Sequence, residues 1–232
     1  MHRVEGLPGE EKPVGLTLAL GRLRALGAVG LRVALPVSGH PLGLCGPPEF
    51  NARALEAEEA VLASGAGLGL IPETYEAGPA GGAGPDVHVE VVWHCLPVRE
   101  APPADVPSLG EAERELAEAL REATELLSTL DVAGAGPVAQ AALEAYRARA
   151  EAGRRMLAPG YPPRAVRVLE LAQRVGALIG IAQQAGGEHG GAVSSSQIAA
   201  RAEALRPVER TARRAQVAAY NSAVEERERH RG

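Results

Sequence analysis

The sequence predicts an α+β protein in which a small antiparallel sheet domain precedes an all-α domain. Before Pro107, Gly- and Pro-rich loops separate short runs of β-branched residues, and after it the chain is rich in Ala, Arg, Glu and Leu. Apolar residues in this second half recur at the helical spacing of three and four. Aromatic residues make up only 3% of the chain, so the core depends on Ala, Leu and Val, a composition that favours the packing of helix against helix.

The first half is predicted to contain a leader and a sheet domain. Residues 1–13 are rich in Gly, Pro and Glu and are expected to form a disordered leader. Residues 14–100 are expected to form a sheet of three or four strands with one or two helices. The leucine spacing in residues 16–26 predicts a helix, and the β-branched run in residues 31–37 predicts a strand.

The middle of the sheet domain leaves two alternatives. Pro47 and Pro48 are typical of a helix start, and this helix is expected to run from residue 49 to about residue 58. Residues 59–63 either extend that helix or form the first strand of a hairpin with residues 68–71. The glycines between these segments favour the hairpin, because they supply the positive φ angles that its turn requires.

A Gly/Pro/Ala loop is predicted for residues 74–85, and the clearest strand of the chain follows it. One face of this strand would carry Val87, Val89, Val91, Trp93 and Cys95, and the other would carry His88, Glu90, Val92 and His94. Such an alternation predicts a sheet with one buried face, and therefore antiparallel strands.

A Pro-rich linker over residues 101–107 is expected to lead into an antiparallel four-helix bundle over residues 108–232. Ser108 and Glu111 form a capping box at the start of its first helix. The remaining helices are expected at about 137–157, at about 164–185 in the centre of the bundle, and from a second capping box at Ser194 and Gln197 onwards. Pro207 is expected to kink or split the last helix.

Composition excludes several classes of function. A net charge of −5 argues against a general affinity for nucleic acid or anionic membranes, and no segment has 18 uninterrupted apolar residues. Lys12 is the only lysine, which argues against Schiff-base and P-loop chemistry. The preference for arginine indicates a GC-rich bacterial genome. Two cysteines do not make a disulfide scaffold, so the sequence predicts a cytoplasmic protein with reduced thiols.

Few residues could bind a metal ion. The available soft ligands are His40, Cys45, His88, His94 and Cys95. None of them has the short Cys-x-x-Cys or His-x-x-x-His spacing of a zinc site, and adjacent strand residues point to opposite faces. The sequence therefore predicts neither a metal nor a cofactor.

Three side chains suggest an alternative function for the sheet domain. His88, Glu90 and His94 share one strand face, and a neighbouring pair could transfer protons if another element covered them. This hypothesis predicts a small-molecule-binding or enzymatic pocket, whereas the other interpretation is the solvated side of a strand.

Two further groups of residues are candidates for an interaction surface. Phe50, the only phenylalanine, and Asn51 follow a long Gly/Pro loop and could contact a partner, although the favoured interpretation of Phe50 is a core residue. Arg206, Arg210, Arg213 and Arg214 fall on one helix face, and residues 201–231 carry a net charge of +3. This face could bind nucleic acid, but no aromatic residue accompanies it, and it could instead pair with the acidic helix at 111–125.

The sequence as a whole favours a non-catalytic protein-interaction or regulatory module. It offers many helix surfaces for a protein partner or for self-association, and no catalytic residue can be assigned. The enzymatic sheet domain and the nucleic-acid-associated protein remain as alternatives.

Overall fold

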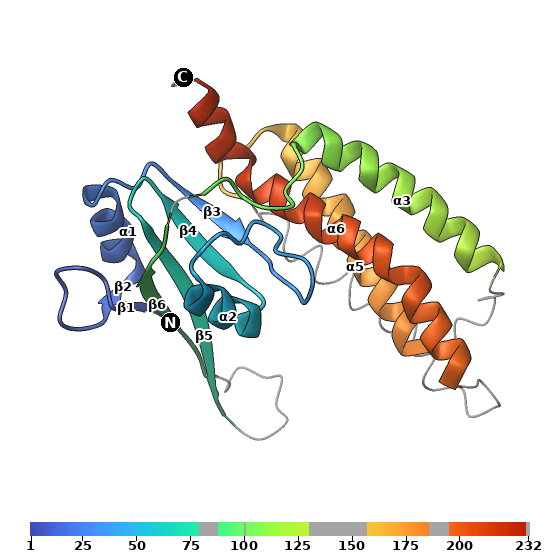
Figure 1. Ribbon diagram of the computed structural model, residues 1–232, viewed down its shortest axis with the longest axis horizontal. Coiled ribbons are helices and arrows are strands. Elements are labelled where there is room, and N and C mark those ends of the chain that lie inside the picture. Colours follow the sequence, from blue (N-terminus) through green and yellow to red (C-terminus); the bar gives the residue numbers. More distant parts are fainter. Residues whose placement is uncertain (79–87, 100, 130–156, 186–194, 231–232) are drawn as a thin grey trace. The chain divides into compact units, whose positions relative to one another are not determined.

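The computed structural model describes residues 1–78, 88–99, 101–129, 157–185 and 195–230. The chain forms two compact units, unit 1 (Met1–Val106) and unit 2 (Pro107–Gly232). The described residues of unit 1 form six strands and two helices, and those of unit 2 form three helices (Figure 1). Their bounds are β1 His2–Glu5, β2 Val14–Gly15, α1 Leu16–Ala25, β3 Gly30–Ala34, α2 Pro48–Ala57, β4 Ala60–Ser64, β5 Leu68–Ala77, β6 His88–Pro97, α3 Leu109–Thr129, α5 Pro163–Ala185 and α6 Ser195–Arg229.

The sheet of unit 1 is mixed and has the strand order β2-β1-β6-β5-β4-β3. Strand β1 runs parallel to β6, and the other neighbouring pairs are antiparallel. The prediction of a small antiparallel sheet with three or four strands is therefore wrong. Strand β1, which the prediction omits, comes from the residues predicted to be a disordered leader. Val4 is its one buried apolar residue, too little for a sequence pattern, and pairing with β6 holds the strand in place.

Both faces of the sheet are covered, whereas the alternation in β6 predicts only one buried face. On the face that carries Leu70 and Cys95, the sheet packs against Ala19 and Leu23 of α1. The opposite face carries Leu62 and Ile71 and packs against α2. The side chains of α2 in this second cluster are Phe50 and Ala54. The residue of β6 that packs against this second cluster is Leu96, near the end of the strand, so the cover on this face leaves no clear mark on the alternation.

The hairpin alternative for residues 59–63 is confirmed. Strand β4 pairs with β5 from Val61, opposite Leu70, to Ala63, opposite Leu68. Gly65 and Gly67 in the turn have φ angles of +88° and +63°, which glycine adopts without strain.

Strand β5 continues far beyond its pairing with β4. It stays in register with β6 up to Ala77, opposite His88, although residues 74–85 are predicted to form a loop. Figure 1 shows β5 and β6 extending together beyond the ends of the other strands. The loop prediction fails over residues 74–77 because pairing with β6, rather than burial of these exposed side chains, makes them a strand.

Unit 2 does not have the predicted four-helix bundle in its described part. It contains three long helices, and α6 packs extensively against both α3 and α5, while α3 and α5 contact each other less. The central helix is therefore α6 and not the more apolar segment at 164–185. Small buried side chains on α6 allow both neighbours to approach closely, among them Ala212, Ala215, Ala218 and Ala219. The helix predicted at 137–157, like Ser194, lies outside the described residues.

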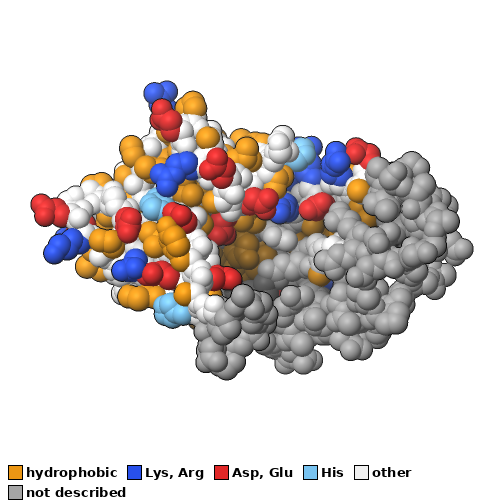
Figure 2. All heavy atoms as spheres, turned by 90° about the horizontal axis from the view of Figure 1, so that it is seen from below, with side chains coloured by type: hydrophobic (Ala, Val, Ile, Leu, Met, Phe, Trp, Pro, Cys, Tyr) orange, Lys and Arg blue, Asp and Glu red, His pale blue; other side chains and the backbone are white. Residues whose placement is uncertain are grey.

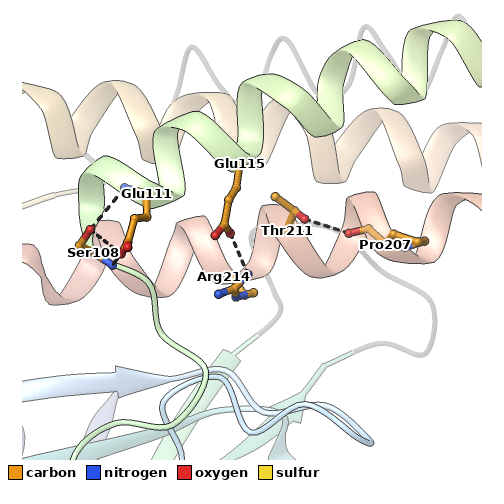
Figure 3. Close-up of polar contacts among 6 residues, drawn as sticks. All are labelled: Ser108, Glu111, Glu115, Pro207, Thr211 and Arg214. Carbon is orange, nitrogen blue, oxygen red and sulfur yellow. Dashed lines mark hydrogen bonds and ion pairs between the residues drawn. The ribbon is translucent and has the colours of Figure 1, made fainter.

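The ends and interior of these helices follow local chemistry. The capping box is confirmed: the Ser108 N–H donates to Glu111 Oε2 at 2.9 Å, and the Glu111 N–H donates to Ser108 Oγ at 3.3 Å (Figure 3). Pro207 lies inside α6 and does not split it. The Thr211 hydroxyl donates to the Pro207 carbonyl at 3.1 Å.

Candidate functional site

The structure does not bring His88, Glu90 and His94 together. They lie on one face of β6, but Glu90 and His94 are four residues apart, about 13 Å along a strand. Glu90 forms an ion pair of 2.5 Å with Arg3 of β1, and His94 is paired with Glu73 of β5 at 2.8 Å. Glu90 and His94 of the predicted pocket therefore have different partners.

The face around His94 carries a small polar cluster. The hydroxyl of Tyr75 is hydrogen-bonded to the Glu73 carboxylate, and this bond, followed by the one to His94, lowers the pKa of Glu73. The same bond raises the pKa of Tyr75. Glu73 and Tyr75 are about half exposed. In Figure 2, the visible surface of unit 1 shows acidic, basic and hydrophobic side chains interspersed. The cluster keeps the Glu73 carboxylate ionised in contact with solvent.

The cysteines do not share a site. Cys95 is buried in the cluster under α1, where burial raises the pKa of its thiol, and Cys45 packs against the cluster under α2. Within the described ranges, no group of three or more His, Cys, Asp or Glu side chains could hold a metal ion. None of the described helices is long and apolar enough to cross a membrane.

Phe50 belongs to the core and is only 1% exposed. Its ring fills the space above two glycines: a Cβ atom built on Gly46 or on Gly69 would lie 2.4 Å from a ring carbon. Asn51, the next residue of α2, is partly buried. Phe50 therefore holds α2 on the sheet and is not on the surface for a partner.

Two arginines of the predicted arginine face form ion pairs within unit 2. Arg214 forms an ion pair of 2.7 Å with Glu115 of α3, with both side chains partly buried (Figure 3). Arg206 pairs with Glu203 one turn away on α6 at 3.1 Å, and Arg210 and Arg213 also have interaction partners. For Arg214, the alternative of pairing with the acidic helix is thus confirmed.

One cavity of unit 2 lies near the end of α6. It has a volume of about 360 Å³ and is lined by Gly160, Ala223, Glu226, Arg227 and His230. The His230 ring is already engaged, because its Nδ1 lies 2.6 Å from the carbonyl oxygen of Glu226. The acidic Glu226 and the basic Arg227 both line this cavity, so it has no preference for an anionic or a cationic ligand.

The backbone hydrogen bonds between β1 and β6 show which residues of β6 are bonded to β1 and which are bonded to β5. The amino group of Met1 donates to the Val89 carbonyl at 2.6 Å, and the Val91 N–H donates to the Met1 carbonyl at 2.7 Å. Odd-numbered residues of β6 therefore direct their backbone groups toward β1, and even-numbered residues direct theirs toward β5. The same alternation continues past the strand, where Val98 donates to Gly67 at 2.8 Å.

Beyond the pairing with β4, this alternation leaves Thr74 and Glu76 of β5 with backbone N–H and C=O groups that face away from β6. Tyr75 lies opposite Glu90, so both of its backbone groups are directed to β6. Thr74 and Glu76, on either side of it, direct their N–H and C=O away from β6. The pairing of β4 ends at Leu70, and in the part of the chain that the structure describes no strand pairs with these two residues on that side. We call the outward side of residues 74–77 the open edge.

The side chains along the open edge are all exposed. Sequence reasoning missed this feature because residues 74–85 were expected to be a loop. Thr74 and Tyr75, both common in strands, are the signal that could have identified it.

Comparison with known proteins identifies relatives along most of the chain. Residues 1–108 match the N-terminal domain, and residues 110–217 the C-terminal domain, of the Rv1486c-like proteins. The uncharacterized protein MT1533 of Mycobacterium tuberculosis is 32% identical over 222 residues, which cover 89% of this chain and 74% of that protein. The uncharacterized protein ML1804 of Mycobacterium leprae is 30% identical, over 83% of this chain and 67% of its own length. No solved structure matches. The chain therefore belongs to the Rv1486c-like protein family.

Proposed function

We propose that this protein is a non-catalytic interaction module that binds an extended segment of a partner protein as an additional strand at the open edge. The observation that carries the proposal is the pair of outward-facing backbone groups at Thr74 and Glu76 on an exposed strand. A bound segment would exchange two hydrogen bonds with each of these residues in an antiparallel arrangement.

The open edge is suited to adding a strand. Its backbone already has an extended conformation, because pairing with β6 fixes it, so little conformational entropy is lost from this side on binding. Pro72 lacks an N–H and limits the pairing toward β4, which confines the backbone hydrogen bonds of a partner to residues 74–77.

The experiment compares Thr74→Pro with Thr74→Val. Proline removes an outward-facing N–H without touching the bonds of Tyr75 to β6, and valine keeps both the N–H and the strand conformation. A library of random displayed peptides is panned against the full chain, and enriched peptides are tested on both variants. We expect binding to be lost in Thr74→Pro and retained in Thr74→Val.

The folding of both variants is monitored by circular dichroism, so a loss of binding cannot come from unfolding. Enriched peptides that bind Thr74→Pro as well as they bind the parent chain would refute strand addition at this edge.

A further inference from the structure

We propose that the segment received at the open edge is basic, with two Lys or Arg side chains three residues apart. This inference rests on the proposed function and specifies the chemistry of the partner. It follows from the charges beside the open edge and from the register that strand pairing imposes.

Acidic side chains surround the open edge. Glu73 and Glu76 lie on β5, and Glu58 and Glu59 lie immediately before β4, close to where its pairing with β5 ends. All four side chains belong to exposed residues. His94 of β6 and Arg53 of α2 are the basic groups that act on Glu73 electrostatically. The balance of charge is negative, so a cationic segment is attracted and an anionic one is repelled.

The register places the two partner charges. Glu73 and Glu76 are an odd number of residues apart, so their side chains emerge on opposite faces of the sheet. Residues of a paired strand face those of β5 one to one, whichever way the segment runs. A basic residue opposite Glu73 and another opposite Glu76 are therefore three positions apart and also emerge on opposite faces.

Tyr75 adds to the preference on one face. It is 48% exposed and lies on the same face as Glu73, so a guanidinium opposite Glu73 can also lie over the face of the Tyr75 ring. The hydrogen bond from Tyr75 lowers the pKa of Glu73, because it favours the ionised form of the carboxylate.

A second copy of the chain fits the open edge less well. It would bring another Glu73 and Glu76 to the same place, and each chain has a net charge of −5. Like charges beside a new strand pair oppose the pairing. Self-association is therefore treated as an outcome of the test and not as the proposal.

The test uses two octapeptides of identical Arg, Thr and Val composition. In one the two arginines are three residues apart, and in the other they are adjacent. Each is titrated into the isotopically labelled full chain at low salt, and binding is measured from the amide chemical shifts of Thr74 and Glu76. We expect the spaced peptide to bind about two- to fivefold more tightly, the effect of one cross-strand ion pair. Added salt should reduce the difference.

A matched pair of variants tests the charge. Glu76→Gln should abolish the preference for the spaced peptide, whereas Glu11→Gln, an equal change before strand β2, should preserve it. In Glu76→Lys, a peptide that carries glutamate in place of one arginine should recover the lost affinity.

The outcomes separate the two proposals. Equal affinity of the two peptides, with shifts still centred on Thr74 and Glu76, would overturn the basic segment and leave strand addition standing. Shifts at these amides that depend only on protein concentration would show that the occupant is a second copy. If no peptide perturbs these amides, and no partner strand reaches them, both proposals fail.

Discussion

At the scale of single residues, the polar groups of unit 1 act in pairs across neighbouring strands. Glu73 accepts a hydrogen bond from Tyr75 two residues away and contacts His94 on β6 at 2.8 Å. Arg3 and Glu90 form the equivalent pair across β1 and β6. These contacts orient side chains on an exposed face. They lower the pKa of Glu73, but they do not form an enclosed site.

The substitution Tyr75→Phe tests this assignment. It removes the hydroxyl, so we expect the pKa of Glu73 to rise toward its ordinary value, as measured by a carboxyl-carbon NMR titration. The lowered pKa of Glu73 in the folded state contributes stability that is present above the unfolded pKa and is lost as the pH falls through the folded one. In Tyr75→Phe this acid-sensitive part should shrink. An unchanged Glu73 titration would contradict the hydrogen bond, and Thr74→Val, on the opposite face, is the control.

At the scale of elements, close packing positions α2, and local hydrogen bonds begin α3. The ring of Phe50 lies directly above Gly69 of β5, and Val98 approaches from the side. Helix α3 begins instead with reciprocal hydrogen bonds between Ser108 and Glu111. The first element depends on contacts distant in sequence and the second on residues three positions apart.

Gly69→Ala should destabilise unit 1. The new Cβ would lie 2.4 Å from the Phe50 ring and 2.9 Å from Val98, so α2 or the strand must shift. We expect a loss of about 1–3 kcal/mol in the free energy of unfolding, measured by urea denaturation. Phe50→Leu relieves the contact, so the double variant should lose less than the sum of the two single changes. Simple additivity would mean that the ring and the glycine are not in contact.

Ser108→Ala should shorten or loosen the start of α3. Loss of an N-cap hydroxyl lowers the free energy of unfolding by about 1 kcal/mol. Ser108→Thr keeps a hydroxyl and should retain most of this stabilisation. The hydrogen bonds to Ser108 lower the pKa of Glu111, so their contribution is present above the unfolded pKa and is lost as the pH falls through the folded value. The difference in thermal stability between the parent chain and Ser108→Ala should therefore narrow in acid. A constant difference at every pH would argue against the capping box.

At the scale of the whole molecule, each of the two units has buried residues of its own among the residues that the structure describes. Both clusters of the sheet, under α1 and under α2, consist of residues of unit 1. In unit 2, Leu116, Leu169 and Val208 from the three described helices are buried. The two sets lie on either side of the boundary between Val106 and Pro107.

Residues 1–106 should therefore fold when expressed alone. A chain of this length buries enough surface for independent stability, and both of its clusters are complete within it. We expect dispersed amide resonances and a single cooperative thermal transition for this fragment. The same fragment without residues 1–5 should lose the transition, because β6 would lose its parallel partner and the core would lose Val4. A fragment 1–106 that lacks tertiary structure would show that unit 1 depends on unit 2.

Some elements could be predicted from residues that lie close together in the sequence. Leucine spacing located α1, the two prolines located the start of α2, glycines located the turn between β4 and β5, and Ser108 with Glu111 located the start of α3. Each of these predictions depends on residues within about ten positions of one another.

Tertiary structure alone decided which strands are neighbours and which groups remain unpaired. Strand β1 and the far half of β5 have few buried side chains. They are strands because β6 pairs with β1 across 89 residues of sequence and with the far half of β5 across 11 to 19 residues. Backbone hydrogen bonds leave no pattern in the side chains. For the same physical reason the sequence could not reveal the open edge at Thr74 and Glu76. It also grouped His88, Glu90 and His94, although the fold gives Glu90 and His94 different partners.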